Sequence, residues 1–451
     1  MFKGKFLSIF LCQAAAAMLF AEPQSPADPD IFSAPGAQID LLAMNAAADM
    51  REASVWVMGS PNQELFVEIS PSNKLSPKKI ATNKDGTALV KFEALKPNTA
   101  YVYKISASPD FKNSVEGTIK TSPDYEKRQA APNFKIAILG KTHRNDPIYD
   151  EPFKTPGGEY EIFGAVKNQK PDAIVWAHNA AIFRPADWGS RSGMAARYRA
   201  ERSDPALKEM LLCAPNYGVI AADSYGAPGA DKNSWNKKDA VDVFKSFWGN
   251  PSYGVGSQEN LATYFRFSDV DVFILDGSTN SNSLDFRSSR PEMFGEAQLN
   301  WLLSALKNSK ATFKLVISNA PITNPVEEKG NFAYCKRERK YLLDFISENK
   351  IGGVIFASAN KDYGEITRML RASEHSLLEL TVGPATARPA KSATEVNFYR
   401  MVGSLILERS FATISFEGAE NDRFLKIEVF NSAGKNLLSQ TIKASELYKF
   451  E

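Results

Sequence analysis

Several polar side chains that could do chemistry directly follow apolar runs of this sequence. They include the carboxylates of Asp223 and Asp362 and the imidazoles of His143 and His178, which are groups that hold divalent metals or transfer protons. The segment 221–224, Ala-Ala-Asp-Ser, offers one carboxylate and one hydroxyl but no imidazole and no thiol. Because the whole chain has 3 histidines, the sequence does not favour a zinc or iron site of ordinary composition.

Cationic side chains lie among the same segments. Lys141 and Lys361 would bring ammonium groups beside the carboxylates, where they could pair with Asp223 and Asp362 and replace the charge of a metal. The other interpretation is that both lysines simply face solvent. The chain contains no G-x-S-x-G and no P-loop pattern, so the sequence indicates neither a nucleophile elbow nor a phosphate-binding loop.

The elements that must position these residues belong to an α/β domain. Apolar runs such as FKIAILG, DAIVWA and VDVFILDG alternate with helical patterns such as GEAQLNWLLSALKNS, which predicts largely buried sheets flanked by helices. Upstream, short alternating runs separated by Pro, Asn, Gly and Asp turns predict a small fibronectin type III-like β-sandwich. We therefore predict a β-sandwich domain at 40–122 and an α/β domain at 123–451.

The composition narrows the class of protein. Of 451 residues, 43% are hydrophobic and 24% are charged, as in ordinary soluble globular proteins. The 54 basic and 52 acidic residues give a formal net charge of +2. This balance does not indicate nucleic acid or an anionic membrane as a partner.

Residues 1–21 have the layout of a secretory signal peptide. Lysines precede an apolar run from Phe6 to Phe20, and Ala21 precedes polar, Pro-containing sequence. We expect cleavage near Ala21, a linker at 22–39, and export to the periplasm or the extracellular space, with no transmembrane segment after cleavage. The competing interpretation is a retained N-terminal anchor.

Two cysteines, Cys213 and Cys335, remain after that cleavage and lie far apart in the sequence. Their spacing implies no disulfide framework. We expect both to be buried and to pack as small apolar residues.

Long segments of the α/β region resemble the PhoD-like alkaline phosphatase and phosphodiesterase family of the calcineurin-like metallophosphoesterases. They include NDPIYDEP, DWGSRSGM, NKKDAVDVFKSFWGNPSYGV, GEAQLNWLLSALKNSKATFK and ERKYLLDFISENKIGGVIF. The resemblance runs from about Phe134 to Leu447. It implies a two-sheet sandwich flanked by helices, preceded by a small β-sandwich, and a parent activity that uses two divalent metals to hydrolyse phosphate esters.

The metal-ligand motifs of that family are not kept. Where the resemblance implies G-S-C, this sequence has Leu-Gly-Lys at 139–141, so Lys141 replaces the thiolate ligand. The family's G-D-N corresponds to His178, Asn179 and Ala180, and the tyrosine that follows it corresponds to Ile182.

Two further motifs are also degenerate. The family's W-D-D-H-D-Y-G corresponds to Ile-Ala-Ala-Asp-Ser-Tyr-Gly at 220–226, and its G-D-x-H corresponds to Ala-Asn-Lys-Asp at 359–362. Asparagines donate neutral carbonyl oxygens, and aspartates stand in histidine positions, so the parent mechanism is not kept. The degenerate site positions are Lys141, Asn179, Asp223, Asn360 and Asp362.

Two hypotheses about function follow. The first is an exported PhoD-like protein that has lost phosphatase activity and has a binding or structural role, without a cofactor and with an unknown ligand or protein partner. The second is an active phosphatase or phosphodiesterase that acts on phosphate esters through Mg²⁺, Mn²⁺ or Ca²⁺ held by Asp223 and Asp362. The candidates for lining a ligand pocket are His143, His178, Arg184, Tyr225 and Lys361.

Strand ends in α/β domains gather at one edge of a sheet. We therefore expect the segments 139–143, 177–181, 221–225 and 357–362 to meet. Acids there would be costly to bury unless a cation replaced the metal. We expect the Lys141 ammonium to form a buried pair with Asp223 or Asp362, in which removal of one partner costs about 3 to 5 kcal/mol.

Overall fold

The computed structural model describes residues 40–71, 77–126, 128–151, 153, 155–282, 290–371 and 374–448. The predicted signal peptide at 1–21 and linker at 22–39 lie outside these residues, and both stay predictions. In the described part of the chain, no helix has the length and apolar character needed to cross a bilayer.

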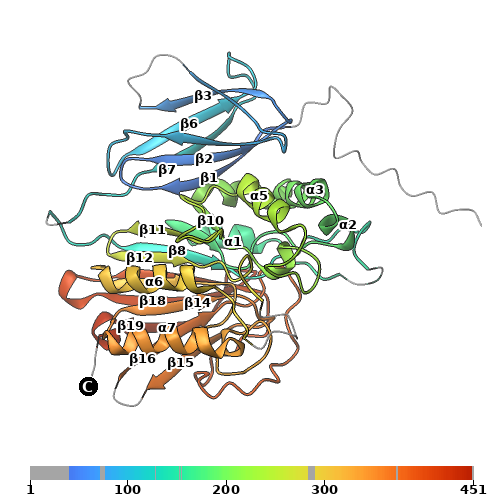
Figure 1. Ribbon diagram of the computed structural model, residues 1–451. Helices are drawn as coiled ribbons and strands as arrows, with labels where there is room; N and C mark the ends of the chain where they lie inside the picture. The colour runs from blue at the N-terminus through green and yellow to red at the C-terminus, as the bar shows by residue number, and fades with distance from the viewer. Residues whose placement is uncertain are drawn as a thin grey trace, which may run out of the picture. The chain divides into compact units, whose positions relative to one another are not determined.

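Seven antiparallel strands form two small N-terminal sheets (Figure 1). Side chains of both sheets, among them Val55, Val90, Leu65 and Tyr103, share one buried cluster, in agreement with the predicted β-sandwich. The predicted domain division at 122/123 falls in the connection between the last of these strands and β8, and it stays a prediction. The first sheet has the order β1 (Leu42–Ala48), β2 (Ala53–Met58), β5 (Thr87–Phe92); the second has the order β4 (Lys78–Ala81), β3 (Glu64–Ser70), β6 (Ala100–Ser106), β7 (Val115–Lys120).

Strand β2 is buried on both of its faces. Val55 and Val57 face the core of the sandwich, while Trp56 and Met58 join a cluster made largely by the α/β region. The indole Nε1 of Trp56 donates a hydrogen bond to the backbone oxygen of Ser246, at 2.8 Å. The β-sandwich is therefore packed directly on the α/β region.

The α/β region contains two sheets of 6 strands each, which confirms the predicted two-sheet architecture. The strands nearest the C-terminus extend the first of these sheets. The first sheet has the order β10 (Asn216–Gly218), β9 (Ala173–Trp176), β8 (Phe134–Leu139), β17 (Ser410–Glu417), β18 (Phe424–Asn431), β19 (Asn436–Lys443). The second has the order β11 (Thr263–Phe267), β12 (Val270–Ile274), β13 (Phe313–Ile317), β14 (Val354–Ser358), β16 (Glu374–Thr381), β15 (Glu365–Arg371).

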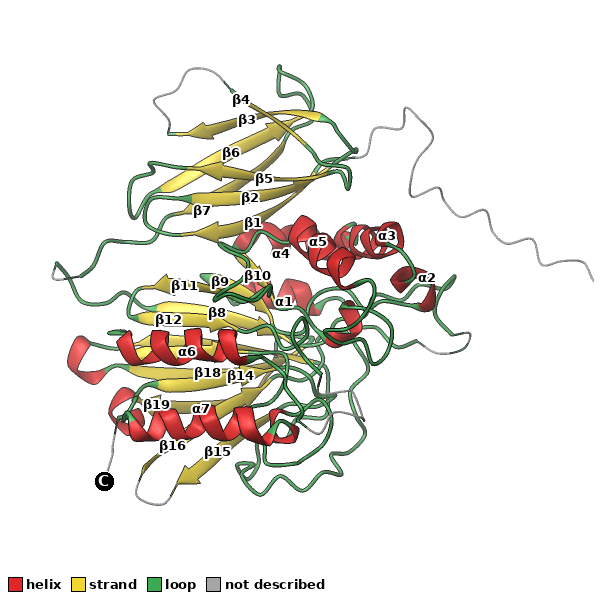
Figure 2. Cartoon of the chain, in the orientation of Figure 1, coloured by secondary structure: helices red, strands yellow, loops and turns green. Residues whose placement is uncertain are grey.

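Helices cover the outer faces of the two sheets (Figure 2). Side chains such as Ile138 of β8 and Val272 of β12 fill the core between the sheets. Leu302 of α6 and Leu342 of α7 cover the second sheet, and Phe244 of α5 belongs to the cluster over the first. The helices are α1 (Ile162–Asn168), α2 (Pro185–Trp188), α3 (Arg191–Arg202), α4 (Lys208–Cys213), α5 (Lys237–Phe247), α6 (Glu296–Asn308) and α7 (Lys336–Glu348).

Each sheet contains a run of neighbouring parallel strands, which brings the ends of several strands to one edge. Strands β8, β9 and β10 run parallel, and so do β12, β13, β14 and β16. Loops that follow parallel strands leave from the same edge of a sheet. The loops after β8, β9, β10 and β14 carry the degenerate site positions.

The two cysteines differ in their surroundings. Cys335 is fully buried in the cluster under α6 and α7, as predicted. Cys213 is exposed, so the prediction that it is buried is wrong. It is the last residue of the short helix α4, where the chain leaves the helix, although partial burial still raises the pKa of its thiol to about 11.

A buried glutamate on β16 fixes the loop that follows β13. The Glu379 carboxylate accepts hydrogen bonds from the backbone N–H groups of Ile322 and Thr323 at 2.8 and 2.6 Å. It also accepts from the hydroxyls of Thr323 and Ser358, at 2.7 and 2.8 Å. Burial raises the pKa of Glu379 above its ordinary value although these bonds oppose the shift. This carboxylate thereby ties the end of β14 to the neighbouring loop.

We predict that Glu379→Gln lowers the free energy of unfolding by about 3 kcal/mol, because the amide nitrogen of glutamine cannot accept the bonds that buried donors give to the carboxylate. Chemical denaturation measures this loss. Glu408→Gln, at an exposed position, is the control and should change stability by less than about 0.5 kcal/mol. Equal effects of the two variants would contradict this role of Glu379.

Candidate functional site

Contacts between four loops define the candidate site. The His178 Nε2 atom lies 3.0 Å from Asn360 Oδ1, and its Nδ1 atom lies 3.7 Å from Asp223 Oδ1. The Lys141 Nζ atom lies 3.3 Å from Asp362 Oδ1. The loops after β8, β9, β10 and β14 therefore meet at one edge, as the sequence predicts.

The Lys141–Asp362 ion pair has the predicted partners but not the predicted burial. The side chain of Lys141 is 23% exposed and that of Asp362 is 56% exposed. Asp362 lies in the loop between β14 and β15, beside an open depression, so water reaches its carboxylate. The predicted ion pair is confirmed, but the prediction that it is buried is wrong. Because water screens a pair of this kind, we now expect a smaller cost than about 3 to 5 kcal/mol for removal of one partner.

Asn179 is a buried structural centre. Its amide nitrogen donates to the Tyr198 hydroxyl and, at 2.8 Å, to Ser224 Oγ. Its amide oxygen accepts from Trp248 Nε1 at 3.1 Å and from the backbone N–H of Ala180 at 2.7 Å. All the hydrogen-bonding capacity of this side chain is used within the protein.

His178 is also buried, with 1% of its surface exposed. Burial lowers the pKa of His178 below its ordinary value, and Asp223 only partly opposes the shift. The neutral ring donates from Nε2 to the oxygen of Asn360, whose own amide nitrogen donates to the backbone oxygen of Gly330, at 3.3 Å. His178 Nδ1 and Asp223 Oδ1 are both buried and have no hydrogen-bond partner among the described residues.

Lys361 has other partners than the two aspartates considered from the sequence. Its ammonium pairs with Glu328 and, at 2.7 Å, with Glu395. Glu395 also accepts a hydrogen bond from the Tyr363 hydroxyl. Burial tends to raise the pKa of Glu395, but the bonds from Lys361 and Tyr363 outweigh it and hold this pKa at about 2.

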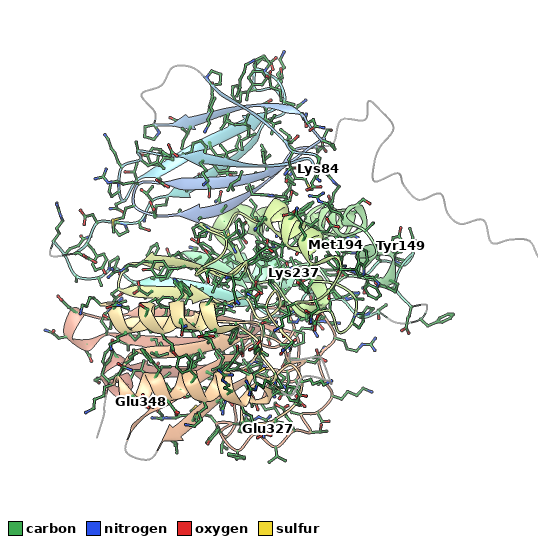
Figure 3. The ribbon with its side chains drawn as sticks, in the orientation of Figure 1. Lys84, Tyr149, Met194, Lys237, Glu327 and Glu348 are labelled. Atoms are coloured by element: carbon green, nitrogen blue, oxygen red, sulfur yellow. The ribbon has the colours of Figure 1, made fainter. Side chains whose placement is uncertain are left out.

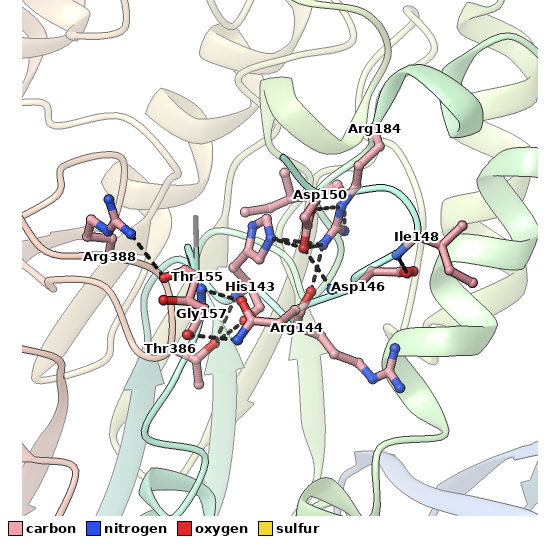
Figure 4. A network of polar contacts seen from close by, with 12 residues as sticks. His143, Arg144, Asp146, Ile148, Asp150, Thr155, Gly157, Arg184, Thr386 and Arg388 are labelled. Carbon is pink, nitrogen blue, oxygen red and sulfur yellow. Dashed lines mark hydrogen bonds and ion pairs between the residues drawn. The ribbon is translucent and has the colours of Figure 1, made fainter. Parts of the chain in front are cut away.

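His143 and Arg184 belong to an internal ion network (Figure 4). Arg184 Nε donates to Asp150 Oδ1 at 2.9 Å, and its Nη2 lies 2.9 Å from His143 Nε2. Burial lowers the pKa of His143, and Arg184 adds to the shift, whereas Asp150, whose Oδ2 atom lies 3.2 Å from the same Nε2 atom, opposes it. Burial tends to raise the pKa of Asp150, but hydrogen bonds, first of all from Arg184, bring it to about 2.

This network holds the loop after β8 in place. Most polar groups of the network bond to one another and are not available to a ligand. Arg184 is 5% exposed and lies 3.4 Å from Glu201 of α3. Burial raises the pKa of Glu201 to about 7 although three arginines oppose the shift. Tyr225 is fully buried, and its hydroxyl has no partner among the described residues.

An open depression of about 320 Å³ lies beside the Lys141–Asp362 pair. Its walls come from the segments 328–331, 360–363 and 390–395 together with Lys141. Figure 3 labels Glu327 and Glu348 near opposite ends of helix α7, so the segment 328–331 lies at the end of α7 where that helix begins. Of the predicted pocket residues, Lys361 lines this depression, and His143, His178, Arg184 and Tyr225 do not.

Sequence reasoning missed Glu328, Asn331 and Glu395, which also line the depression. None of the three directly follows an apolar strand, so the rule that site residues follow apolar strands does not identify them. From the sequence alone, the only reason to expect an acid here is that Lys361 needs an acidic partner.

The residues present do not fit a dinuclear metal centre. In the described ranges, no group of three or more His, Cys, Asp and Glu side chains is arranged to hold a metal. Lys141 brings an ammonium group to the position where the resemblance implies a thiolate ligand, and the amide of Asn179 is fully used by protein partners. Asp223 and Asp362 have different partners, His178 and Lys141.

Comparison with known proteins supports the resemblance found in the sequence. A family model described as PhoD-like phosphatase matches residues 245–425, which confirms the similarity to this family over that stretch. No curated protein matches the chain.

Two solved structures share the fold. One is titled as the structure of PhoD; the similarity covers 89% of this chain and 92% of that chain, with 12% identity and a TM-score of 0.69. The other is purple acid phosphatase PPD1 from yellow lupin (Lupinus luteus) seeds; here the similarity covers 90% of this chain and 74% of that chain, with 11% identity and a TM-score of 0.66. At these identities the likeness shows the fold, which is the predicted metallophosphoesterase-like sandwich.

We predict a coupling energy of about 1 kcal/mol or less between Lys141 and Asp362, since the pair is partly exposed. A double-mutant cycle with Lys141→Met and Asp362→Asn, measured by chemical denaturation, gives this coupling. A coupling of 3 kcal/mol or more would show that the pair is shielded from water and would contradict the small value.

Proposed function

We propose that this chain, which has the fold of PhoD-like phosphatases, does not hydrolyse phosphate esters through a dinuclear metal centre and acts by binding at the same edge. One observation carries the proposal. The positions aligned with family ligands hold Lys141, Asn179 and Asn360, and the polar groups of all three contact other protein groups. These side chains complete the interior of the site without a metal.

The chemistry of the parent reaction explains why these changes matter. A dinuclear phosphoesterase needs two cations held close together, which activate water and stabilise charge on the phosphoryl oxygens. An ammonium group in the first ligand position repels such cations. The amides in two other positions provide no negative charge to compensate for it.

A second candidate function is an active phosphatase with a remodelled metal site. The observation that favours it is the pair of buried, unpartnered atoms His178 Nδ1 and Asp223 Oδ1, which lie 3.7 Å apart. A bound cation would satisfy both atoms. This candidate predicts that activity depends on added metal and on Asp223.

Export is the second part of the proposal. It rests on the sequence of residues 1–21, in which lysines precede an apolar run that ends before Ala21. The proposed location is the periplasm or the extracellular space, with the linker at 22–39 preceding the β-sandwich.

We predict that the purified mature chain hydrolyses p-nitrophenyl phosphate and bis(p-nitrophenyl) phosphate no faster than a protein-free blank, with or without Mn²⁺, Ca²⁺ or Zn²⁺. The reason is that no group of three or more His, Cys, Asp and Glu side chains among the described residues is arranged to hold a metal that would activate water. Release of p-nitrophenol, followed by absorbance, measures the rate. Metal-dependent turnover that is lost in Asp223→Ala, but kept in the control Asp422→Ala at an exposed position, would establish the second candidate instead.

We predict that expression of the full chain in a host with a secretory pathway yields a product whose N-terminus lies at or near Glu22. Mass spectrometry of the intact secreted protein measures this position. A product that keeps Met1 and stays with the membrane fraction would establish a retained anchor.

A further inference from the structure

Helix α3 contacts the β-sandwich with one face and the loops of the candidate site with the next. Side chains three, four, seven or eight positions apart lie on the same face of a helix. The face toward the sandwich carries Arg191, Arg199 and Arg202, and the face toward the loops includes Arg197 and Tyr198. The helix therefore joins two parts of the protein that are distant in the sequence.

A buried aspartate of the sandwich holds the beginning of α3. Asp85 lies in the turn between β4 and β5 and is 8% exposed. Its carboxylate accepts hydrogen bonds from both terminal nitrogens of Arg191, at 2.5 and 2.6 Å, and from Ser246 Oγ at 2.7 Å. Burial tends to raise the pKa of Asp85, but these bonds outweigh it and lower the pKa below its ordinary value. A bidentate pair between charged groups is a strong and directional contact.

Two more arginines of α3 bind the sandwich through backbone oxygens and an aromatic ring. Arg199 donates to the backbone oxygen of Gly59, at 3.2 Å, and to that of Asp85. The guanidinium of Arg202 is fully buried and lies 5.9 Å from the ring centre of Trp56, which belongs to β2. A cation shielded from water is attracted to the face of such a ring. The sandwich thus holds α3 along its whole length.

The next face of α3 holds the loops that carry the degenerate site positions. Arg197 Nη1 donates to Asp146 Oδ2 at 2.9 Å, and Asp146 lies in the loop after β8, which also carries Lys141. The hydroxyl of Tyr198 accepts a hydrogen bond from the amide of Asn179, in the loop after β9. The same short helix therefore positions both loops.

We propose that α3 couples the β-sandwich to the candidate site, so that the ion pair between Asp85 and Arg191 helps to position the loops after β8 and β9. A helix of 12 residues moves largely as one body, and rigid elements of this kind carry coupling between distant sites. Asp85 and Arg191 are positioning residues, because they act on the site through α3. This role of the β-sandwich does not depend on whether the site holds a metal.

Hydrogen exchange of the native mature chain, followed by mass spectrometry of its peptides, tests the coupling. The backbone N–H groups of His143 and Asp146 donate to Thr386 Oγ1 and Asp150 Oδ2, so their exchange reports how often this loop opens. Asp85→Asn removes the charge that holds Arg191. We expect the peptide of residues 140–151 to exchange about fivefold faster or more in this variant.

Two further variants make this result specific. Arg191→Lys keeps the charge but loses the bidentate geometry, so it should accelerate the same peptide more mildly, also if Asp85→Asn does not fold. Val67→Ala is the control, because it opens a cavity in a sandwich cluster that contains no residue of α3. It should lower the stability measured by chemical denaturation, yet leave the exchange of residues 140–151 within about twofold of that of the unchanged protein.

Coupling acts in both directions, so a change at the site should reach the sandwich. Asp146→Asn removes the charge that holds Arg197, and we expect faster exchange in the peptide of residues 83–88, where the Gly86 amide donates to the backbone oxygen of Asn83, at 2.9 Å. Unchanged exchange of 140–151 in both Asp85→Asn and Arg191→Lys would overturn the proposal. Equal acceleration by Val67→Ala, or unchanged exchange of 83–88 in Asp146→Asn, would overturn it too.

Discussion

Carboxylates gather around the candidate site, and in this chain lysine ammonium groups pair with them. Lys141 pairs with Asp362, and Lys361 pairs with Glu328 and Glu395. Without such cations, acids brought together at one edge would repel one another or lose the solvation that they need. This constraint links the loops after β8 and β14 to the segments around 328 and 395, and it explains how the edge keeps its form with degenerate ligand motifs.

The polar side chains behind these ion pairs are buried and bonded to other parts of the fold. Asn179 joins the loop after β9 to Ser224 and to Trp248, and the Trp248 ring lies 4.1 Å from the buried guanidinium of Arg202. Arg184 ties the loop after β8 to α3 through Asp150 and Glu201. These internal hydrogen bonds and ion pairs position the site residues independently of any ligand. This explains how the fold resembles PhoD-like phosphatases while the groups at its edge differ.

The sequence predicts the strands and the four loops because apolar runs followed by polar segments have direct structural meaning. Charge also predicts that Lys141 pairs with an acid, but it leaves Asp223 and Asp362 as alternatives, and the structure selects Asp362. The partners of Lys361 do not follow from charge, since Glu328 and Glu395 come from loops that no pattern brings near it. The sequence does not predict the exposure of Asp362 and of Cys213 for a related reason. Asp362 lies in the loop between β14 and β15 and Cys213 ends helix α4, and burial at such positions depends on neighbours distant in the sequence. His143 and Arg184 are predicted to line a ligand pocket, but both contact Asp150 and neither lines the depression.

The central claim is that the candidate site is completed by its own side chains and does not hold two divalent metals. Calorimetric titration of Mn²⁺ into the dialysed mature chain tests it most directly. The account predicts no binding with a dissociation constant below about 100 μM, since an ammonium and two amides replace anionic or imidazole ligands. Two ions bound per chain at micromolar affinity, lost in Asp223→Ala, would contradict it.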